Sequence, residues 1–341
     1  MSTTVGPGAS SVPTLDEVAR EAGVSRSTAS RAINGGERVS PSAQAAVDDA
    51  VARLGFVPNR AARSLVTRRT GSVALVLPEP DERVLNDPFL TATLRGVSSA
   101  LGSSDLQLIL IMARPGEKEG RIARYLSSGH VDGVIVASHH REDGLEDALR
   151  TSSLPSVFVG RPFSPDGLTF IDMDNAGGAR LAVRRMVERG CRRIATVTGP
   201  DDMTSGVDRL TGWRAAMAEA GLADDAVETG DFTLLGGAAA MERLLDEHPD
   251  IDGVFAASDM MAAGALRVLR ERGRSVPDDV AVIGFDDLDM AADPAIALTT
   301  IHNDVSELVR LACDALLTTI EVGSATTPPP LPARLVSRSS G

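Results

Sequence analysis

The stretch VAREAGVSRSTASRAIN, residues 18–34, decides how the first part of this 341-residue chain folds. It contains two runs with helical spacing, joined by a glycine and a serine. Thr14 and Glu17, just ahead of it, have the spacing of a capping box, which begins a helix. Apolar and small residues then recur at the i, i+3, i+4 and i+7 positions of a packed helix face, namely Leu15, Val18, Ala19 and Ala22.

A second short helix is predicted over about residues 26–33, because Gly23 ends the first helix and Ser25 can cap the next one. One side of this helix is small and apolar, with Ala29, Ala32 and Ile33. Guanidinium, hydroxyl and amide groups occupy the other side, on Arg26, Ser27, Ser30, Arg31 and Asn34. Such groups pair with base edges in DNA. We therefore interpret the pair as a helix-turn-helix rather than as helices with an ordinary solvated face.

A third helix and an arginine-rich segment follow. Ser40 and Pro41 predict a helix start, and Gly55 predicts its end. Its packed face consists of Val47, Ala50, Val51 and Leu54. Residues 59–66 could form a short helix that is stable only against a partner, and Leu65 could then wedge into a minor-groove step. An ordinary basic linker explains the same residues equally well.

Charge and composition narrow the class of protein. The net charge is −13, yet residues 1–70 hold nine arginines against six acidic residues. A basic head often binds nucleic acid, although an unevenly charged surface is the open alternative. Two cysteines without ligand-like spacing fit a reducing compartment. We expect a cytoplasmic protein that does not enter a membrane, because no signal-peptide pattern or membrane-length apolar run is present.

The remainder of the chain, from residue 71, alternates short apolar runs with helical patterns. Parallel strands buried on both faces have this pattern, and they are predicted at 72–78, 106–112, 132–138, 155–160, 193–199, 252–258 and 280–285. These strands are too many for one small sheet, so we expect two α/β subdomains with a ligand between them, at the carboxyl ends of the strands. A short returning strand is expected within residues 333–338.

Polar residues follow several of these strands and are candidate ligand contacts. Ser138, Ser258 and Asp286 come directly after strands, and Arg209 lies in the helix beyond another. Arginine can hold paired oxygens through two parallel donors.

His139 and His140 could ligate a metal, but a polar loop is the favoured interpretation, and no metal or cofactor is expected. The sequence also lacks a P-loop, a nucleophile elbow and a zinc-spaced cluster, which argues against an enzyme.

Residues 14–337 resemble the lac repressor/galactose repressor family of bacterial transcription regulators. The head matches the family pattern except for Glu17 and Ala29, where Asp and Val are common. The body carries similar segments in the family order: DPFL (87–90), VDGVIV (131–136), DNAGGARLAVRRMVERG (174–190), GPDDMTSGVDRLTGW (199–213), SDMMAAGAL (258–266), VIGFDD (282–287) and ALTTI (297–301).

The resemblance implies an α/β fold: an N-terminal helix-turn-helix head plus two doubly wound parallel α/β subdomains of the periplasmic-binding-protein type. The expected divisions are a tail (1–13), the head (14–58), a hinge helix and linker (59–70), and an effector-binding and dimerisation domain (71–341), with one subdomain at about 71–168 and 301–325 and the other at about 169–300 and 326–341.

The resemblance also implies which residues contact DNA. It makes residues 26–34 the recognition helix, places Arg26 and Ser27 at the positions that most strongly select the operator, and makes Leu65 an intercalating hinge residue. The expected DNA contacts are Thr14, Ser25, Arg26, Ser27, Thr28, Ser30, Arg31, Asn34, Ser40, Asn59, Ala62 and Leu65. The expected partner is a palindromic double-stranded operator, bound by a homodimer or a higher oligomer.

For the effector, the resemblance singles out Arg209 and Asp286 and adds two aromatic residues, for which core packing is the alternative. The expected contacts are Phe89, Ser138, Arg161, Arg209, Phe232, Ser258, Asp259 and Asp286. Ser258 stands where Asn is common, and Gly160 where Asp is common. The predicted function is an allosteric repressor controlled by a sugar or sugar derivative. The alternatives are a purine-like corepressor, a cytosolic solute-binding protein and a DNA-binding protein without a ligand.

Overall fold

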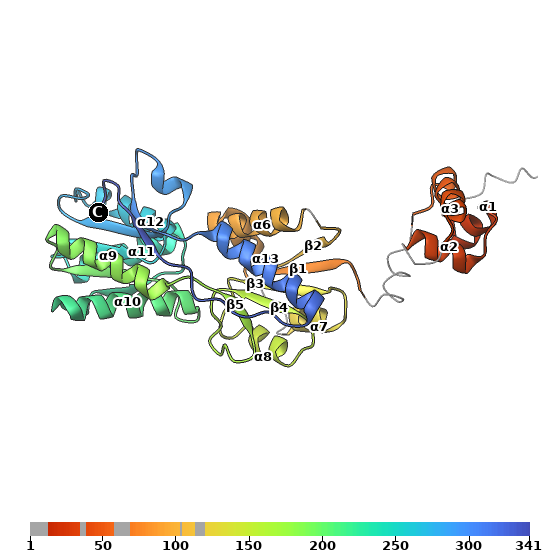
Figure 1. Cartoon of the computed structure of the whole chain (residues 1–341). Helices are drawn as coiled ribbons and strands as arrows, with labels where there is room; N and C mark the ends of the chain where they lie inside the picture. Colours follow the sequence, from red (N-terminus) through yellow and green to blue (C-terminus); the bar gives the residue numbers. More distant parts are fainter. Residues whose placement is uncertain (1–12, 35–38, 58–68, 103, 113–119) are drawn as a thin grey trace, which may run out of the picture. The chain divides into compact units, whose positions relative to one another are not determined.

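The computed structural model describes residues 13–34, 39–57, 69–102, 104–112 and 120–341, and it divides into two units at Thr70/Gly71 (Figure 1). This is the division expected between the linker and the effector-binding domain. The expected hinge residues Asn59, Ala62 and Leu65 lie outside the described residues.

The first unit contains the predicted helix-turn-helix. Its helices are α1 (Leu15–Glu21), α2 (Arg26–Ile33) and α3 (Pro41–Leu54). Thr14 forms the expected capping box with Glu17, and Ser25 and Ser40 cap α2 and α3. The third helix ends at Gly55, whose φ of 62° suits a residue without a Cβ. The buried core of this unit consists of Val18, Ala19, Ala29, Ala32, Val47 and Ala50.

The second unit contains two sheets. The first has the order β2-β1-β3-β4-β5 and is wholly parallel. Its strands are β1 (Ser72–Leu77), β2 (Gln107–Met112), β3 (Gly133–Ala137), β4 (Ser156–Val159) and β5 (Thr169–Ile171). The second has the order β11-β10-β9-β8-β6-β7, in which only β11 is antiparallel. Its strands are β6 (Ile194–Thr198), β7 (Val227–Thr229), β8 (Gly253–Ala256), β9 (Ala281–Asp286), β10 (Thr299–His302) and β11 (Arg334–Val336).

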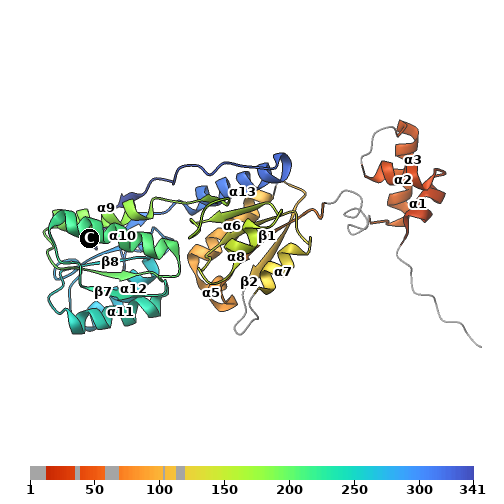
Figure 2. The same cartoon turned by 90° about the horizontal axis from the view of Figure 1, so that it is seen from below.

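Helices cover both faces of each sheet, which confirms the doubly wound α/β fold (Figures 1 and 2). One face of the first sheet carries α5 (Asp81–Asn86), α6 (Pro88–Leu101) and α13 (Val305–Val322), and the other carries α7 (Arg121–Ser127) and α8 (Leu145–Arg150). One face of the second sheet carries α9 (Asn175–Arg189) and α10 (Thr204–Ala220), and the other carries α11 (Leu234–Glu247) and α12 (Asp259–Glu271). A short 3₁₀ helix spans Asp289–Ala292. None of the helices in the described part of the chain has the length and apolarity needed to cross a bilayer.

Two of the expected subdomain boundaries need correction. Residues 169–171 form β5, the edge strand of the first sheet, so the first subdomain extends beyond residue 168. Ile301 and His302 belong to β10 of the second sheet, so the return to the first subdomain comes after residue 302. These strands are short and partly polar, so they form no clear apolar run in the sequence. Their extended structure depends on pairing with a neighbouring strand.

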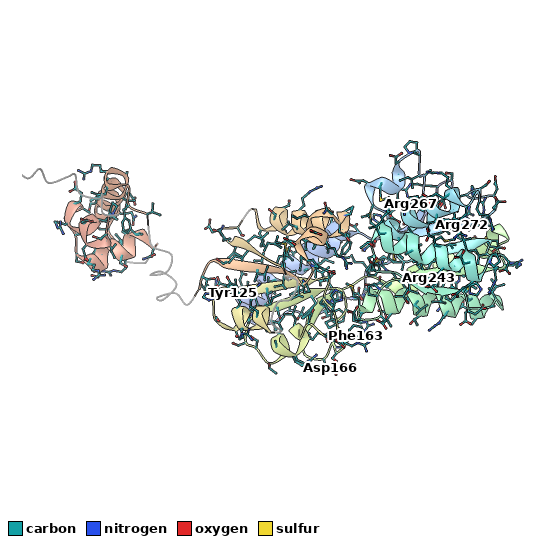
Figure 3. All side chains as sticks on the ribbon, turned by 180° about the vertical axis from the view of Figure 1, so that it is seen from behind. Tyr125, Phe163, Asp166, Arg243, Arg267 and Arg272 are labelled. Carbon is teal, nitrogen blue, oxygen red and sulfur yellow. The ribbon has the colours of Figure 1, made fainter. Side chains whose placement is uncertain are left out.

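Arginines of the second subdomain form ion pairs with acidic residues on its surface. Figure 3 shows Arg243, Arg267 and Arg272 over α11 and α12. Arg243 Nε lies 2.6 Å from Glu228 Oε2, and Arg272 Nη1 lies 2.8 Å from Asp246 Oδ1. Acidic side chains thus offset the positive charge of this surface.

The close packing of α9 on α10 gives a stability prediction. A Cβ on Gly212 would lie 2.1 Å from the carbonyl oxygen of Ala176. Gly212→Ala should therefore destabilise the protein by about 3 kcal/mol, although helix propensity alone would favour alanine by about 1 kcal/mol. Thermal unfolding of the full chain measures the effect, with the exposed Ala218→Gly as control. A rise in melting temperature for Gly212→Ala would contradict the close approach.

Candidate functional site

The exposed face of α2 carries the polar residues predicted from the sequence. Arg26, Ser27, Arg31 and Asn34 are exposed, and Ser30 is half-buried. Arg31 Nε donates to the Ser27 carbonyl at 3.2 Å, and Asn34 Nδ2 donates to the Ser30 carbonyl at 2.7 Å. These bonds orient both side chains along the helix while leaving further donors free.

Asp16 of α1 lies beside the polar face of α2, although helical periodicity within α2 did not predict an acidic residue there. Arg26 Nε is 3.3 Å from Asp16 Oδ1 of α1, and both side chains are largely exposed. An exposed ion pair of this kind contributes little stability and exchanges readily for another partner. Arg26 therefore remains available to DNA.

Three of the hydroxyl groups predicted to contact DNA serve as helix caps. Those of Thr14, Ser25 and Ser40 each accept a bond from a backbone N–H in the first turn of their helix. Thr28 Oγ1 lies 2.8 Å from Ser25 Oγ. The caps fix the N-termini of all three helices, and at α2 and α3, whose first turns carry no acidic residue, the partial positive charge favours phosphate.

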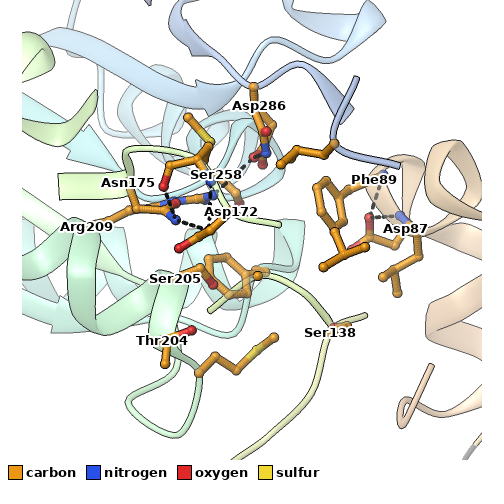
Figure 4. A pocket seen from close by; sticks show the side chains of 18 of the residues that line it. Asp87, Phe89, Ser138, Asp172, Asn175, Thr204, Ser205, Arg209, Ser258 and Asp286 are labelled. Carbon is orange, nitrogen blue, oxygen red and sulfur yellow. Dashed lines mark hydrogen bonds and ion pairs between the residues drawn. The ribbon is translucent and has the colours of Figure 1, made fainter. Parts of the chain in front are cut away.

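A pocket of about 820 Å³, including space open to solvent, lies between the two sheets of the second unit. It opens at the carboxyl ends of the parallel strands, as expected for a doubly wound fold. Figure 4 shows that its residues come from both subdomains. Polar side chains on its wall include Asp87, Ser138, Asp172, Asn175, Thr204, Ser205, Arg209, Ser258, Asp286 and Asn303.

The buried guanidinium of Arg209 forms one wall of the pocket. It donates to Asn175 Oδ1 at 2.9 Å, to the Ala257 carbonyl at 2.6 Å and to Asp286 Oδ1 at 3.4 Å. The Phe285 ring lies below it, with 3.6 Å between Cζ and the ring centroid. Burial lowers the pKa of Arg209 and raises the pKa of Asp286 to about 6. The paired groups can present oxygen and N–H to a ligand without an isolated buried charge.

Further oxygen acceptors surround this pair. Burial raises the pKa of Asp172 to about 6 and also raises the pKa of Asp87. Asn303 Nδ2 donates to Asp286 Oδ1 at 3.3 Å, whereas Asn303 Oδ1 is buried and has no hydrogen-bond partner among the described residues. An unpaired buried acceptor favours a ligand that supplies a hydroxyl or N–H donor.

Two phenyl rings complete the pocket. Phe89 lies in the first turn of α6 in the first subdomain, and Phe232 precedes α11 in the second. Both line the cavity and both also pack against the apolar core, so their contact with a ligand stays a prediction. The Arg209 guanidinium lies 5.7 Å from the centroid of the Phe232 ring. Apolar faces beside many acceptors suit a ligand with both C–H faces and hydroxyl groups.

Most of the expected effector contacts lie together, but two do not. Phe89, Ser138, Arg209, Phe232, Ser258 and Asp286 line the pocket. The wall does not include Arg161, whose Nη2 instead bonds both Asp208 carboxylate oxygens at 2.7 and 2.8 Å. It also excludes Asp259, which is buried and accepts from Thr300 Oγ1 at 2.6 Å and from the Leu288 N–H at 2.8 Å. Burial raises the pKa of Asp259 to about 8.

Sequence reasoning missed several residues of the pocket wall: Asp87, His139, Asp172, Asn175 and Asn303. Asp172 and Asn303 directly follow β5 and β10, the short strands that the apolar pattern did not reveal. Recognising those strands would have brought both residues into the candidate set by the strand-end rule. Within the described residues, no acidic, histidine or cysteine cluster suits a metal ion, and His139 and His140 belong to none.

The Arg209–Asp286 pair gives a second prediction. Arg209→Met leaves a buried carboxylate unpaired, so it should cost about 3–5 kcal/mol of stability at pH 8. The loss should be smaller at pH 5, because without arginine the pKa of Asp286 rises further and the carboxyl group becomes protonated. Thermal unfolding of the full chain at both pH values measures this. The double change with Asp286→Asn should recover much of the loss at pH 8; full stability of the single variant there would contradict the pairing.

Comparison with known proteins matches both units. Residues 14–59 match the model of bacterial regulatory proteins of the lacI family, and residues 183–341 match a periplasmic binding protein-like domain. The chain is 46% identical over 335 residues to the HTH-type transcriptional regulator CelR of Thermobifida fusca, covering 96% of this chain and 98% of that one.

Solved structures show the same architecture. A complex of the transcriptional regulator CelR with cellobiose has a TM-score of 0.76 and 42% identity, covering 96% of this chain and 100% of that one. The lac repressor dimer bound to operator and the anti-inducer ONPF has a TM-score of 0.84 and 26% identity, covering 97% and 99%.

Proposed function

The chain belongs to the lacI family of bacterial regulatory proteins, and on that premise we propose that it is a repressor released from its operator by a neutral disaccharide. Like these relatives it is a DNA-binding transcriptional regulator, and not an enzyme. One observation carries the proposal: a single chain combines a helix face of arginine, serine and asparagine with a cleft of carboxylates, amides and phenyl rings.

On the DNA side, we assign base contacts to Arg26, Ser27, Arg31 and Asn34, since guanidinium and amide groups pair with guanine and adenine. Ser30 and the capped helix ends contribute to phosphate binding. The roles of Asn59, Ala62 and Leu65 stay predictions, because these residues lie outside the described part of the chain.

A homodimer fits this assignment, because a palindromic operator presents two half-sites to two recognition helices. The lac repressor binds its operator as a dimer. In this chain, Leu235 at the start of α11 is a large apolar side chain with 71% exposure. Leu234, Leu266 and Met290 line a cavity beside it. An apolar surface of this kind supports contact with a second copy.

The charges of the pocket favour a neutral effector over a sugar phosphate. Arg209 is paired with Asp286, and Arg83 with Glu79 at 3.2 Å. Among the residues that line the pocket, both arginines are thus already neutralised, while Asp172 adds a further carboxyl group. Carboxylates accept bonds from hydroxyl groups and repel phosphate.

Similarity to the CelR complex supports a disaccharide in particular. That protein holds cellobiose in a structure that aligns over nearly the whole of both chains. Phe89 and Phe232 come from opposite subdomains and provide apolar surfaces for sugar rings. We therefore propose cellobiose or a closely related disaccharide as the effector.

Calorimetry with a ligand panel tests the effector. Cellobiose should bind the full-length protein with measurable heat, whereas its 6-phosphate should bind at least tenfold more weakly because of the pocket carboxylates. A nucleobase such as hypoxanthine tests the corepressor alternative. Tighter binding of the phosphorylated sugar, or binding of the nucleobase alone, would contradict the proposal.

Operator binding tests the assignment of the helix face. Arg31→Ala should weaken binding to the specific operator by about 1–3 kcal/mol, or roughly 5- to 150-fold, because one base-reading side chain is lost. Arg53→Ala removes an exposed arginine of α3 that pairs with Glu21, and serves as the matched control. Fluorescence anisotropy at fixed salt measures both. Equal effects of the two changes would mean that Arg31 acts only through its charge.

A further inference from the structure

The two subdomains meet in a set of polar contacts beside the pocket, and some residues of the segments that make these contacts also line it. On the first subdomain, these contacts use residues 138–141 and 161–163, which follow β3 and β4 and which we call the first lip. On the second, they use residues 202–208, the start of α10 and the loop before it, which we call the second lip. The Arg141 N–H donates to the Asp202 carbonyl at 2.8 Å.

The His140 ring occupies the centre of these contacts. Its Nδ1 lies 2.8 Å from Asp202 Oδ2 of the second lip, and its Nε2 lies 3.1 Å from Glu79 Oε1 of the first subdomain. Only the imidazolium carries a proton on both nitrogens. A neutral ring would turn a lone pair toward one of the two carboxylates, so the geometry selects the protonated form.

Other residues hold the two ends of this bridge in place. Glu79 is almost fully buried, and it also accepts from Ser138 Oγ at 2.7 Å and pairs with Arg83. Asp143 accepts from the His140 backbone N–H at 2.9 Å. The charged and titratable groups facing the ring are thus Glu79 with Arg83 from the segment after β1, Asp202 from the second lip, and His139, Arg141 and Asp143 from its own loop.

A second ion pair crosses the cleft beside the first. Arg161 of the first lip bonds both carboxylate oxygens of Asp208 on α10, and the Thr204 hydroxyl donates to the Arg161 carbonyl. Phe163, labelled in Figure 3, lies under the Arg141 guanidinium with 4.0 Å between Cζ and the ring centroid. Unlike this arginine pair, the histidine bridge can be switched by a proton at accessible pH.

We infer that the His140 imidazolium is a clasp that joins the two lips and so positions the pocket residues of both subdomains around the effector. His140 does not line the pocket, and it is therefore a positioning residue rather than a ligand contact. The choice of ligand in this inference rests on the proposed function, whereas the clasp rests on the contacts of His140 alone.

The clasp predicts how effector affinity depends on pH. The bond to Glu79 and that to Asp202 raise the pKa of His140 from 6.5 to about 9. A raised histidine pKa means that the contribution of the clasp is complete below pH 6.5 and is lost as the pH rises through about 9. Because the clasped, protonated form holds the pocket residues of both subdomains in place, it should bind the effector more tightly, and affinity for cellobiose should fall severalfold between pH 7 and pH 10. Asp259, with a pKa of about 8, titrates in the same range and has to be separated from His140.

Variants of the full-length protein make this separation. His140→Gln keeps Asp259 but cannot donate to two opposed carboxylates, so at pH 7 it should bind cellobiose severalfold more weakly than the wild type and lose the decline toward pH 10. His140→Arg, which stays charged, should bind more tightly than His140→Gln with the same flat profile. His130→Gln, an exposed histidine of the same subdomain, is the matched control. Wild-type affinity and pH profile in His140→Gln would overturn the inference.

Histidine titration by NMR without ligand keeps this test independent of the effector. In the ligand-free wild type, His140 should titrate near pH 9, and Asp202→Asn should lower that midpoint by at least one unit. Should cellobiose fail to bind the wild type, the proposed effector is wrong, and this titration still decides the clasp. A midpoint near 6.5, unchanged by Asp202→Asn, would show that His140 does not bridge the lips.

Discussion

The buried guanidinium of Arg209 is the interaction on which the cleft depends. It ties α10 to the start of α9 through Asn175, to the end of β8 through the Ala257 carbonyl, and to the end of β9 through Asp286. Burying a charge costs free energy unless bonds and an opposite charge offset it. Here Asp286 pairs with the guanidinium of Arg209 and neutralises its charge. Among the described residues that line the pocket, carboxyl groups therefore remain without an unpaired cation. This balance suits a neutral, hydroxyl-rich ligand.

The same cleft is also where the two subdomains are joined. The chain passes between the sheets after β5, after β10 and after α13, and the pocket residues Asp172 and Asn303 stand at the first two of these passages. A ligand that contacts both subdomains and these passages interacts differently with each arrangement of the subdomains. Such differential affinity is the only means by which a ligand can shift a conformational equilibrium. We place the allosteric control of DNA binding here.

Local signals in the sequence predicted much of the fold. Thr14, Ser25 and Ser40 with Pro41 start helices where the capping patterns predicted them, because a cap acts within one turn. The apolar runs predicted the central strands, which are buried on both faces. β5, β7 and β10 escaped, because polar residues such as threonine, glutamate and histidine interrupt these short strands and leave no apolar run.

The site was predicted in part for the same reason. Arg209 and Asp286 follow strands that the sequence reveals, whereas Asp172 and Asn303 follow strands that it hides. Arg161 and Asp259 are polar residues near strand ends, but their partners, Asp208 and Thr300, lie 47 and 41 residues farther along the chain. No local pattern encodes a side chain's choice between a ligand and a distant partner.

Thermodynamic linkage between the two sites is the central claim, and a reciprocal titration tests it most directly. Operator affinity is measured with and without saturating cellobiose, and cellobiose affinity with and without saturating operator, in one buffer. Linkage requires both affinities to fall by the same factor, which we expect to be at least tenfold. Operator affinity that stays the same while cellobiose fills the cleft would contradict the account.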